Sequence, residues 1–171
     1  MKIRSVLLWL VVIFATLIAG CGDKGPWDGP YGVKQGISPD DLSKFAELKK
    51  LSDGNYTATS APTPAAYVKG YQYLFSKKTG LCIIRVHSEL SEPEARTLTS
   101  GLVKKYGQQT VISPTSKGDM AEWFWSKSTN KLPDNLARVT LYVITPKAVE
   151  ELYEFENSDS CRKELGWAPL G

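Results

Sequence analysis

The chain has 171 residues, of which 42% are hydrophobic, and its 21 basic residues face 18 acidic ones, giving a net charge of +3. This length suits one compact domain with enough chain to bury a core, so a second domain is not expected. The near balance of charge lacks the basic footprint of a nucleic-acid-binding protein, and no nucleic-acid partner is expected.

The first 20 residues have the layout of a signal peptide. Lys2 and Arg4 precede an uncharged run from Ser5 to Gly20, which ends in small residues directly before Cys21. Two basic residues, an apolar stretch and a small-residue end are the features that a signal peptidase recognises. The uncharged run is shorter than the roughly 20 residues that a spanning helix needs, so a permanent transmembrane helix is the alternative interpretation.

The segment Leu17-Ile18-Ala19-Gly20-Cys21 resembles the lipobox of bacterial lipoproteins. The resemblance covers residues 1–22 and implies cleavage before Cys21, with acyl chains on its sulfur and its new amino group. Several acyl chains, at about 0.8 kcal/mol per buried methylene, would make the membrane attachment permanent. The implied location is the bacterial cell envelope, facing the periplasm, and Gly22 after the cysteine favours the inner leaflet of the outer membrane over the inner membrane. The alternative for Cys21 is an ordinary small residue at the end of a signal peptide.

Cleavage would leave residues 21–171, in which 19 basic side chains face 18 acidic ones because Lys2 and Arg4 are removed. Apart from the lipidated residue, Cys82 and Cys161 are the remaining cysteines, and an oxidising periplasm favours a disulfide between them. Two separately buried thiols are the alternative. These cysteines and the single histidine are too few for a zinc site, so neither a metal nor another cofactor is expected.

Residues 21–36 are rich in glycine and proline, which predicts a flexible tether between the lipid and a domain spanning residues 37–171. Trp27 and Tyr31 interrupt this pattern. Their rings either lie at the lipid headgroups or fold back onto the domain.

Two segments carry helix-start signals. Ser38 with Pro39 and two acids predicts a helix from about Pro39 to Lys50. Ser91-Glu92-Pro93-Glu94 predicts a capping box and a helix that ends at Gly107. Residues 52–66, between the two helices, are predicted to form a loop or an irregular edge of the sheet.

Runs of aromatic and β-branched residues predict strands on either side of the second helix. A hairpin is expected from residues 67–76 and 81–88, and further strands from residues 122–126, 138–145 and 151–156. Residues 158–166 read as a polar turn or a short helix. The expected fold is a single α+β domain in which an antiparallel sheet of about five strands packs against two helices, in the order α-β-β-α-β-β-β.

Three tryptophans are candidates for a partner or ligand surface. Trp123 and Trp125 are two residues apart in a predicted strand, so their side chains lie on the same face of it. Trp167 lies near the end of the chain. Large aromatic residues at interfaces often anchor a partner, but a core wall against the helices is the favoured alternative for the first two.

No catalytic residue can be assigned from the sequence. His87 is the only histidine, and no serine lies in a nucleophile-elbow pattern. A cluster of acids is formed by Glu150, Glu151, Glu154 and Glu156. It could serve a glycosidase, although Glu154 and Glu156 are expected to form the wet face of a strand opposite Tyr153 and Phe155.

These features favour a non-enzymatic envelope lipoprotein that binds another envelope component, with a protein as the favoured partner, as assembly-accessory and immunity lipoproteins do. One alternative is a periplasmic hydrolase that acts on peptidoglycan or glycan. Another is a small-molecule carrier whose pocket is lined by Trp123 and Trp125.

Overall fold

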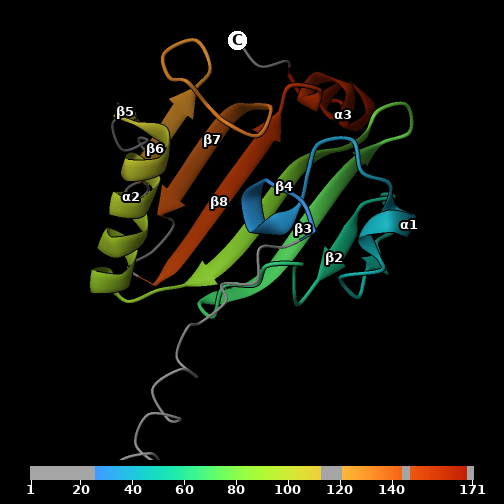
Figure 1. The fold of residues 1–171 in the computed structure, drawn as a ribbon, viewed down its shortest axis with the longest axis horizontal. Helices are drawn as coiled ribbons and strands as arrows, with labels where there is room; N and C mark the ends of the chain where they lie inside the picture. The colour runs from blue at the N-terminus through green and yellow to red at the C-terminus, as the bar shows by residue number, and fades with distance from the viewer. Residues whose placement is uncertain (1–25, 113–120, 144–146, 169–171) are drawn as a thin grey trace, which may run out of the picture.

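The computed structural model describes residues 26–112, 121–143 and 147–168. Within these residues one antiparallel sheet of eight strands has the order β1-β2-β3-β4-β8-β7-β6-β5 (Figure 1). The strands are β1 Lys49–Lys50, β2 Tyr56–Ala58, β3 Val68–Ser76, β4 Gly80–Glu89, β5 Thr110–Ile112, β6 Ala121–Ser126, β7 Leu136–Val143 and β8 Ala148–Phe155. The helices are η1 Pro30–Gly32, a 3₁₀ turn, and α1 Pro39–Leu42, α2 Glu92–Tyr106 and α3 Ser158–Leu165.

The α+β class and the antiparallel sheet are confirmed, but the expected numbers of elements were too low. Eight strands and three α-helices replace the expected five and two in the described residues. The strands β1, β2 and β5 are only two or three residues long, so they show no alternation that a sequence pattern could reveal. Their pairing with longer neighbouring strands, rather than local preference, holds them in the sheet.

The hairpin of β3 and β4 forms as expected and lies inside the sheet. Its turn needs Gly80, whose φ is +70° and whose added Cβ would stand 2.3 Å from the carbonyl oxygen of Gly36. The two backbones meet there because the Gly36 amide donates to the Leu81 carbonyl at 2.9 Å and the Leu81 amide donates to the Ile37 carbonyl at 3.0 Å. The end of the hairpin therefore holds the N-terminal segment against the sheet.

The two faces of the sheet are covered differently. Along β8, Val149, Tyr153 and Phe155 belong to the main core cluster, which also includes side chains of α2. Leu152, at an intervening position, belongs to a smaller cluster with Cys161 of α3. Figure 1 shows α2 beside β5 and β6 at one end of the sheet and η1 in front of the central strands. The main core thus lies between the sheet and the layer formed by α2 and the N-terminal segment.

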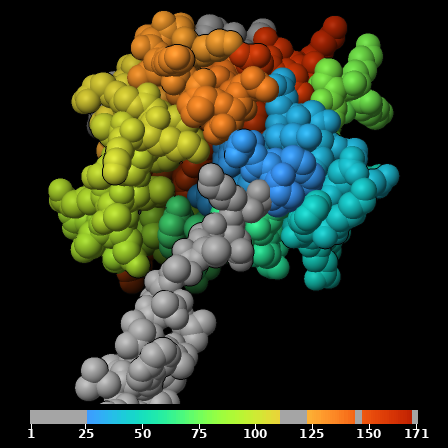
Figure 2. Space-filling model, in the orientation of Figure 1, coloured from blue at the N-terminus to red at the C-terminus, as the bar shows by residue number. Residues whose placement is uncertain are grey.

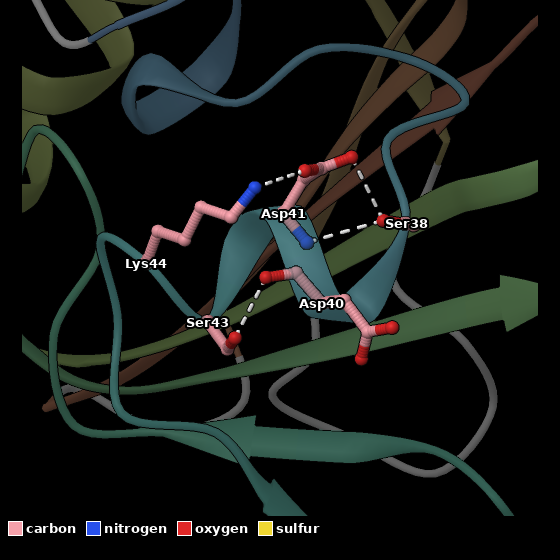
Figure 3. Close-up of polar contacts among 5 residues, drawn as sticks. All are labelled: Ser38, Asp40, Asp41, Ser43 and Lys44. Carbon is pink, nitrogen blue, oxygen red and sulfur yellow. Dashed lines mark hydrogen bonds and ion pairs between the residues drawn. The ribbon is translucent and has the colours of Figure 1, made fainter.

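The start of α1 follows the predicted cap. Ser38 Oγ accepts a hydrogen bond from the Asp41 amide at 3.1 Å, and Lys44 pairs with the Asp41 carboxylate at 2.6 Å (Figure 3). The Ser43 hydroxyl donates to the Asp40 carbonyl at 2.7 Å. These contacts close one turn of helix at the surface.

The predicted length of this helix is wrong. It was expected to reach Lys50, but α1 ends at Leu42 because Lys49 and Lys50 pair with β2 as the edge strand of the sheet. Leu42 is buried, whereas Phe45 is exposed and packs against Trp27. Tertiary pairing has overridden a local helical pattern here.

The second helix is confirmed almost to the residue. In α2 the Ser91 amide donates to the Glu94 carboxylate at 2.7 Å, which closes the capping box, and the C-cap is Gly107 at φ +87°.

The expected tether also extended too far along the chain. It was expected to include all of residues 21–36, but Pro30, Gly32 and Val33 are buried in the folded domain. Of the two alternatives for the aromatic rings of this segment, the structure shows packing on the domain, because Trp27 contacts Phe45 with ring centroids 5.0 Å apart. The N-terminal segment is therefore part of the folded domain.

Candidate functional site

A pocket of about 470 Å³ opens between α2, η1 and the sheet. Figure 2 shows the surface hollowed between the yellow-green helix α2 and the blue N-terminal segment. Its sides are apolar, formed by Leu90, Leu98 and Leu102 from α2 and the residues before it, with Pro30 opposite. An apolar concave site with a few converging polar groups is the usual form of a small-molecule site.

The floor of the pocket carries the carboxyl of Glu151, which is only 1% exposed. Glu151 lies at an alternate position of β8 between Val149 and Tyr153, so the strand turns it toward the core face. The Tyr31 hydroxyl donates to one carboxyl oxygen at 2.8 Å, and the Tyr153 hydroxyl donates to the other at 2.5 Å. Tyr31 of the 3₁₀ turn η1 and Tyr153 of β8 thus both donate hydrogen bonds to the Glu151 carboxyl.

Four tyrosines line this pocket, and they come from different parts of the chain. They are Tyr31 from η1, Tyr67 from the residue before β3, Tyr106 from α2 and Tyr153 from β8. The Tyr67 and Tyr31 hydroxyls lie 3.4 Å apart. The Tyr31 and Tyr153 rings stand almost perpendicular, at 84°, with centroids 5.9 Å apart. The rings therefore form walls in different planes around the carboxyl.

Burial sets the electrostatics of this group. Loss of solvent raises the pKa of Glu151, and the hydrogen bonds from Tyr153 and Tyr31 oppose that rise only in part. The pKa of Tyr153 is raised by burial first and then by the nearby Glu151 charge, and the pKa of Tyr31 rises for related reasons. The phenols therefore stay protonated and remain hydrogen-bond donors, while the carboxyl is the group that can gain or lose a proton.

Charged groups at the rim already have partners. Lys105 Nζ lies 3.6 Å from the Asp134 carboxylate and 5.1 Å from the centroid of the Tyr106 ring. Glu94 is held in the capping box by Ser91. Within the described part of the chain, Glu151 accepts hydrogen bonds from tyrosines and forms no ion pair with a cationic side chain.

The structure does not bring the three candidate tryptophans together. Trp125 is fully buried in the main core, where its Nε1–H donates to the Gly107 carbonyl at 2.7 Å, and Trp123 packs against the same core. Neither Trp123 nor Trp125 is among the residues that line this pocket, whose aromatic residues are tyrosines. Trp167 follows α3, is 37% exposed, and lies between Arg85 and Arg162, whose guanidinium carbons are 5.6 and 5.9 Å from its ring centroid.

The glutamate cluster of β8 is divided between the two faces. Glu150 pairs with Arg85 at 3.1 Å and with His87 at 3.4 Å on the face away from the pocket. Glu154 was expected on a wet face, but it is only 1% exposed because α3 covers it and Arg162 Nε donates to it at 2.9 Å. Glu156 follows the strand and pairs with Lys127. Of this cluster, Glu151 alone is placed at the pocket.

The two cysteines of the domain meet as a disulfide. Cys82 on β4 and Cys161 on α3 have Cα atoms 6.2 Å apart and are both buried in the smaller cluster. This link holds α3 on the face of the sheet opposite the pocket. The candidate lipidation site Cys21 lies outside the described residues.

The sequence held one usable signal for this site. Glu151 has the same strand parity as Tyr153 and Phe155, so the alternation that buries those rings also places this glutamate on the core face. Tyr31 lies in a glycine-rich segment without periodicity and Tyr67 at the start of a predicted strand, and only the fold shows that the two hydroxyls meet beside Glu151.

Neither the described residues nor the similarity of the chain to known proteins assigns it a membrane span, a metal site or a family. Within residues 26–112, 121–143 and 147–168, no helix is long and apolar enough to cross a membrane, and no group of three or more potential ligands among His, Cys, Asp and Glu could hold a metal ion. No protein-family model, curated protein or solved structure matches the chain.

Proposed function

We propose that this chain is a bacterial envelope lipoprotein whose domain is a non-enzymatic binding module, and that the pocket at Glu151 is its ligand site. The observation that supports the ligand site is a buried carboxyl in a pocket with apolar and aromatic walls, with two tyrosine hydroxyls directed at it. A carboxyl buried without a cation costs stability, and groups with shifted pKa values are concentrated at functional sites. The carrier hypothesis thus moves from the tryptophans to the tyrosine-lined pocket.

The proposed lipid anchor would keep this pocket close to the membrane. Pro30, which lines the pocket, lies nine positions after Cys21 in the sequence. A chain extends by at most about 3.6 Å per residue, so the pocket wall would stand within about 30 Å of the anchored sulfur. This geometry suits a protein that takes up or presents a ligand near the membrane surface.

Gly101 provides a test of the ligand site. It lies in α2 and lines the pocket, and a Cβ added there meets no atom within 4 Å. Gly101→Phe is expected to place a ring in the pocket and to prevent ligand retention, while the gain in helix preference over glycine keeps the domain folded. The measurement is untargeted mass spectrometry of small molecules released by denaturing full-length protein purified from its own host.

Gly101→Ala is the matched control for this test, because it gives the same helical benefit without a side chain large enough to fill the pocket. A compound released by the wild type and by Gly101→Ala, but not by Gly101→Phe, would support the ligand site. If all three proteins release the same compounds, or none, the pocket is not a ligand site.

The lipid anchor has a separate test. The intact mass of the protein extracted from membranes is expected to match residues 21–171 plus acyl chains, and Cys21→Ser is expected to abolish both the added mass and the membrane association. An unmodified chain cleaved elsewhere would contradict the proposed anchor.

A protein partner is the second candidate, and the exposed position of Trp167 between two arginines favours it. Exposed tryptophan and arginine are typical anchors of protein interfaces. Photo-crosslinking in cells from position 167, compared with position 101 on the other face, is expected to capture one reproducible envelope protein from position 167 if this candidate is correct.

A further inference from the structure

We propose that the pocket binds an organic cation, an ammonium group on an apolar body, with the ammonium against the Glu151 carboxylate and the tyrosine rings around it. This inference rests on the proposed ligand site and names the chemical class of its ligand. It follows from three features of the pocket: the arrangement of its rings, the absence of a positive partner for Glu151 among the described residues, and a cation that already contacts one of its rings.

The rings are arranged as the walls of a cation site. The pocket-lining rings of Tyr31 and Tyr153 stand at 84° to each other, with a centroid separation of 5.9 Å. The face of an aromatic ring carries negative partial charge and attracts an ammonium that lies within about 6 Å of the centroid. Rings in different planes beside one carboxylate are the arrangement that recognises amines and quaternary ammonium groups.

The carboxyl at the floor has only tyrosines as hydrogen-bond donors in the described part of the chain. Glu151 accepts from Tyr31 and Tyr153, and no cationic side chain pairs with it there. Each carboxylate oxygen can accept more than one hydrogen bond, so acceptor positions remain for a ligand N–H group. A bound ammonium would provide the positive charge that a buried carboxylate needs, whereas a bound anion would add a second negative charge beside it.

Lys105 shows that a cation is favourable at this wall. Its Nζ lies over the Tyr106 ring at 5.1 Å, and Asp134 holds it there from the rim at 3.6 Å. Because Asp134 pairs with this ammonium, Lys105 is not the partner of Glu151 at the floor. The apolar sides, formed by Leu90, Leu98 and Leu102, are suited to the body of the ligand.

The titratable and charged groups around Glu151 determine the expected pH dependence. The pocket itself is lined by Tyr31, Tyr67, Tyr106 and Tyr153 and by the charged residues Glu94 and Lys105. Tyr71 packs against the Tyr31 ring, and Asp134 pairs with Lys105. The raised pKa values of these tyrosines keep them protonated, which leaves Glu151, whose own pKa is raised by burial, as the floor group that gains or loses a proton. A cation binds the ionised carboxyl, so its affinity should rise with pH until Glu151 is ionised in the free protein and then level off. A neutral ligand that accepts a hydrogen bond from the protonated carboxyl should show the opposite trend.

Three probes with the same phenylethyl body distinguish these cases. Full-length lipidated protein in nanodiscs is titrated calorimetrically with 2-phenylethylamine, 2-phenylethanol and 3-phenylpropionate from about pH 5 to about pH 8, and empty nanodiscs provide the blank. At the upper pH the amine is expected to bind about tenfold or more tightly than the alcohol or the acid, and that advantage is expected to shrink toward the lower pH. The same titrations in buffers of different ionisation enthalpy should show proton release on amine binding.

Glu151→Gln is expected to weaken amine binding about tenfold or more while alcohol binding changes less than about twofold, because the amide keeps the shape of the side chain and loses its charge. Glu156→Gln removes one negative charge outside the pocket and is the matched control, with no expected effect on either probe. If the alcohol binds the wild type as tightly as the amine, or if Glu151→Gln leaves amine binding unchanged, the cation inference is wrong and the ligand site remains. If no probe binds, the cation inference is also wrong. Whether the pocket is a ligand site is then decided separately, by whether the wild type retains a compound that Gly101→Phe does not.

Discussion

Replacing Cys82 and Cys161 together with alanine is expected to lower the free energy of unfolding by as much as about 4 to 5 kcal/mol. The disulfide joins positions that are 79 residues apart, and a cross-link over a loop of that length restricts the unfolded chain by about this amount in the loop-entropy model. The measurement is urea unfolding of the full-length protein, followed by tryptophan fluorescence and by far-ultraviolet circular dichroism.

The disulfide lies where its loss would also loosen the helix α3. The helix α3 has only eight residues, and a helix this short is not stable by itself in water. It is held on the sheet by the disulfide and by a small cluster of buried residues around Leu74 and Ile83. Glu154 is also covered by α3, so loosening of this helix would expose a buried ion pair with Arg162.

Three comparisons isolate the covalent link. The wild type treated with reductant should match the double variant, and Cys82→Ala alone should be as unstable as the pair and should leave one reactive thiol. Because both cysteines are buried, alanine also removes some packing, which the reduced wild type retains. A wild type whose unfolding midpoint does not change on reduction would show that the link adds no stability.

The fold was predictable where the sequence carries strong local signals. The hairpin of β3 and β4 and the helix α2 were predicted because alternation, turn residues and a capping box agree with one another there. The length of α1 was not predictable, because the pairing of Lys49 and Lys50 with β2 competes with a weak helical pattern. The strand β5 was missed for a related reason, since three residues cannot show a period.

Only one residue of the candidate site, Glu151, could be placed from the sequence. Strand parity alone places Glu151 on the core face, since Tyr153 and Phe155 share its alternation. The contact with Tyr31 could not be predicted, because the two residues are 120 positions apart and a glycine-rich segment had no pattern to indicate that it folds onto the sheet. Trp125 was expected to be a core residue more often than a ligand, and its burial in the main core agrees with that expectation.

Glu151→Gln is expected to raise the free energy of unfolding at neutral pH by about 1 to 3 kcal/mol, the usual cost of a buried polar group that is not fully compensated. Burial raises the pKa of Glu151 in the folded protein above its value in the unfolded chain, which is about 4.3. The folded state therefore holds this proton more tightly. The stability from the protonated group is complete below the unfolded pKa and is lost as pH rises through the folded pKa.

The wild type is thus expected to lose stability from about pH 4.3 upward, and Glu151→Gln is expected to flatten this part of the profile. The amide can accept from one tyrosine hydroxyl and donate to the other, so the contacts with Tyr31 and Tyr153 can persist without the charge. The measurement is the urea unfolding midpoint at a series of pH values. Burial also raises the pKa of Glu154, so the wild-type slope contains both groups and the difference between the proteins isolates Glu151.

Glu156→Gln is the control for this profile, because its carboxylate is at the surface with Lys127 and its removal should leave the slope unchanged. Parallel profiles for the wild type and Glu151→Gln would show that the buried carboxyl does not titrate with folding. A further comparison links stability to the proposed ligand, since an amine that binds the ionised carboxyl should restore the lost stability at high pH in the wild type only. A buried carboxyl that lowers stability until a cation covers it is easier to explain as part of a binding site than as part of the core.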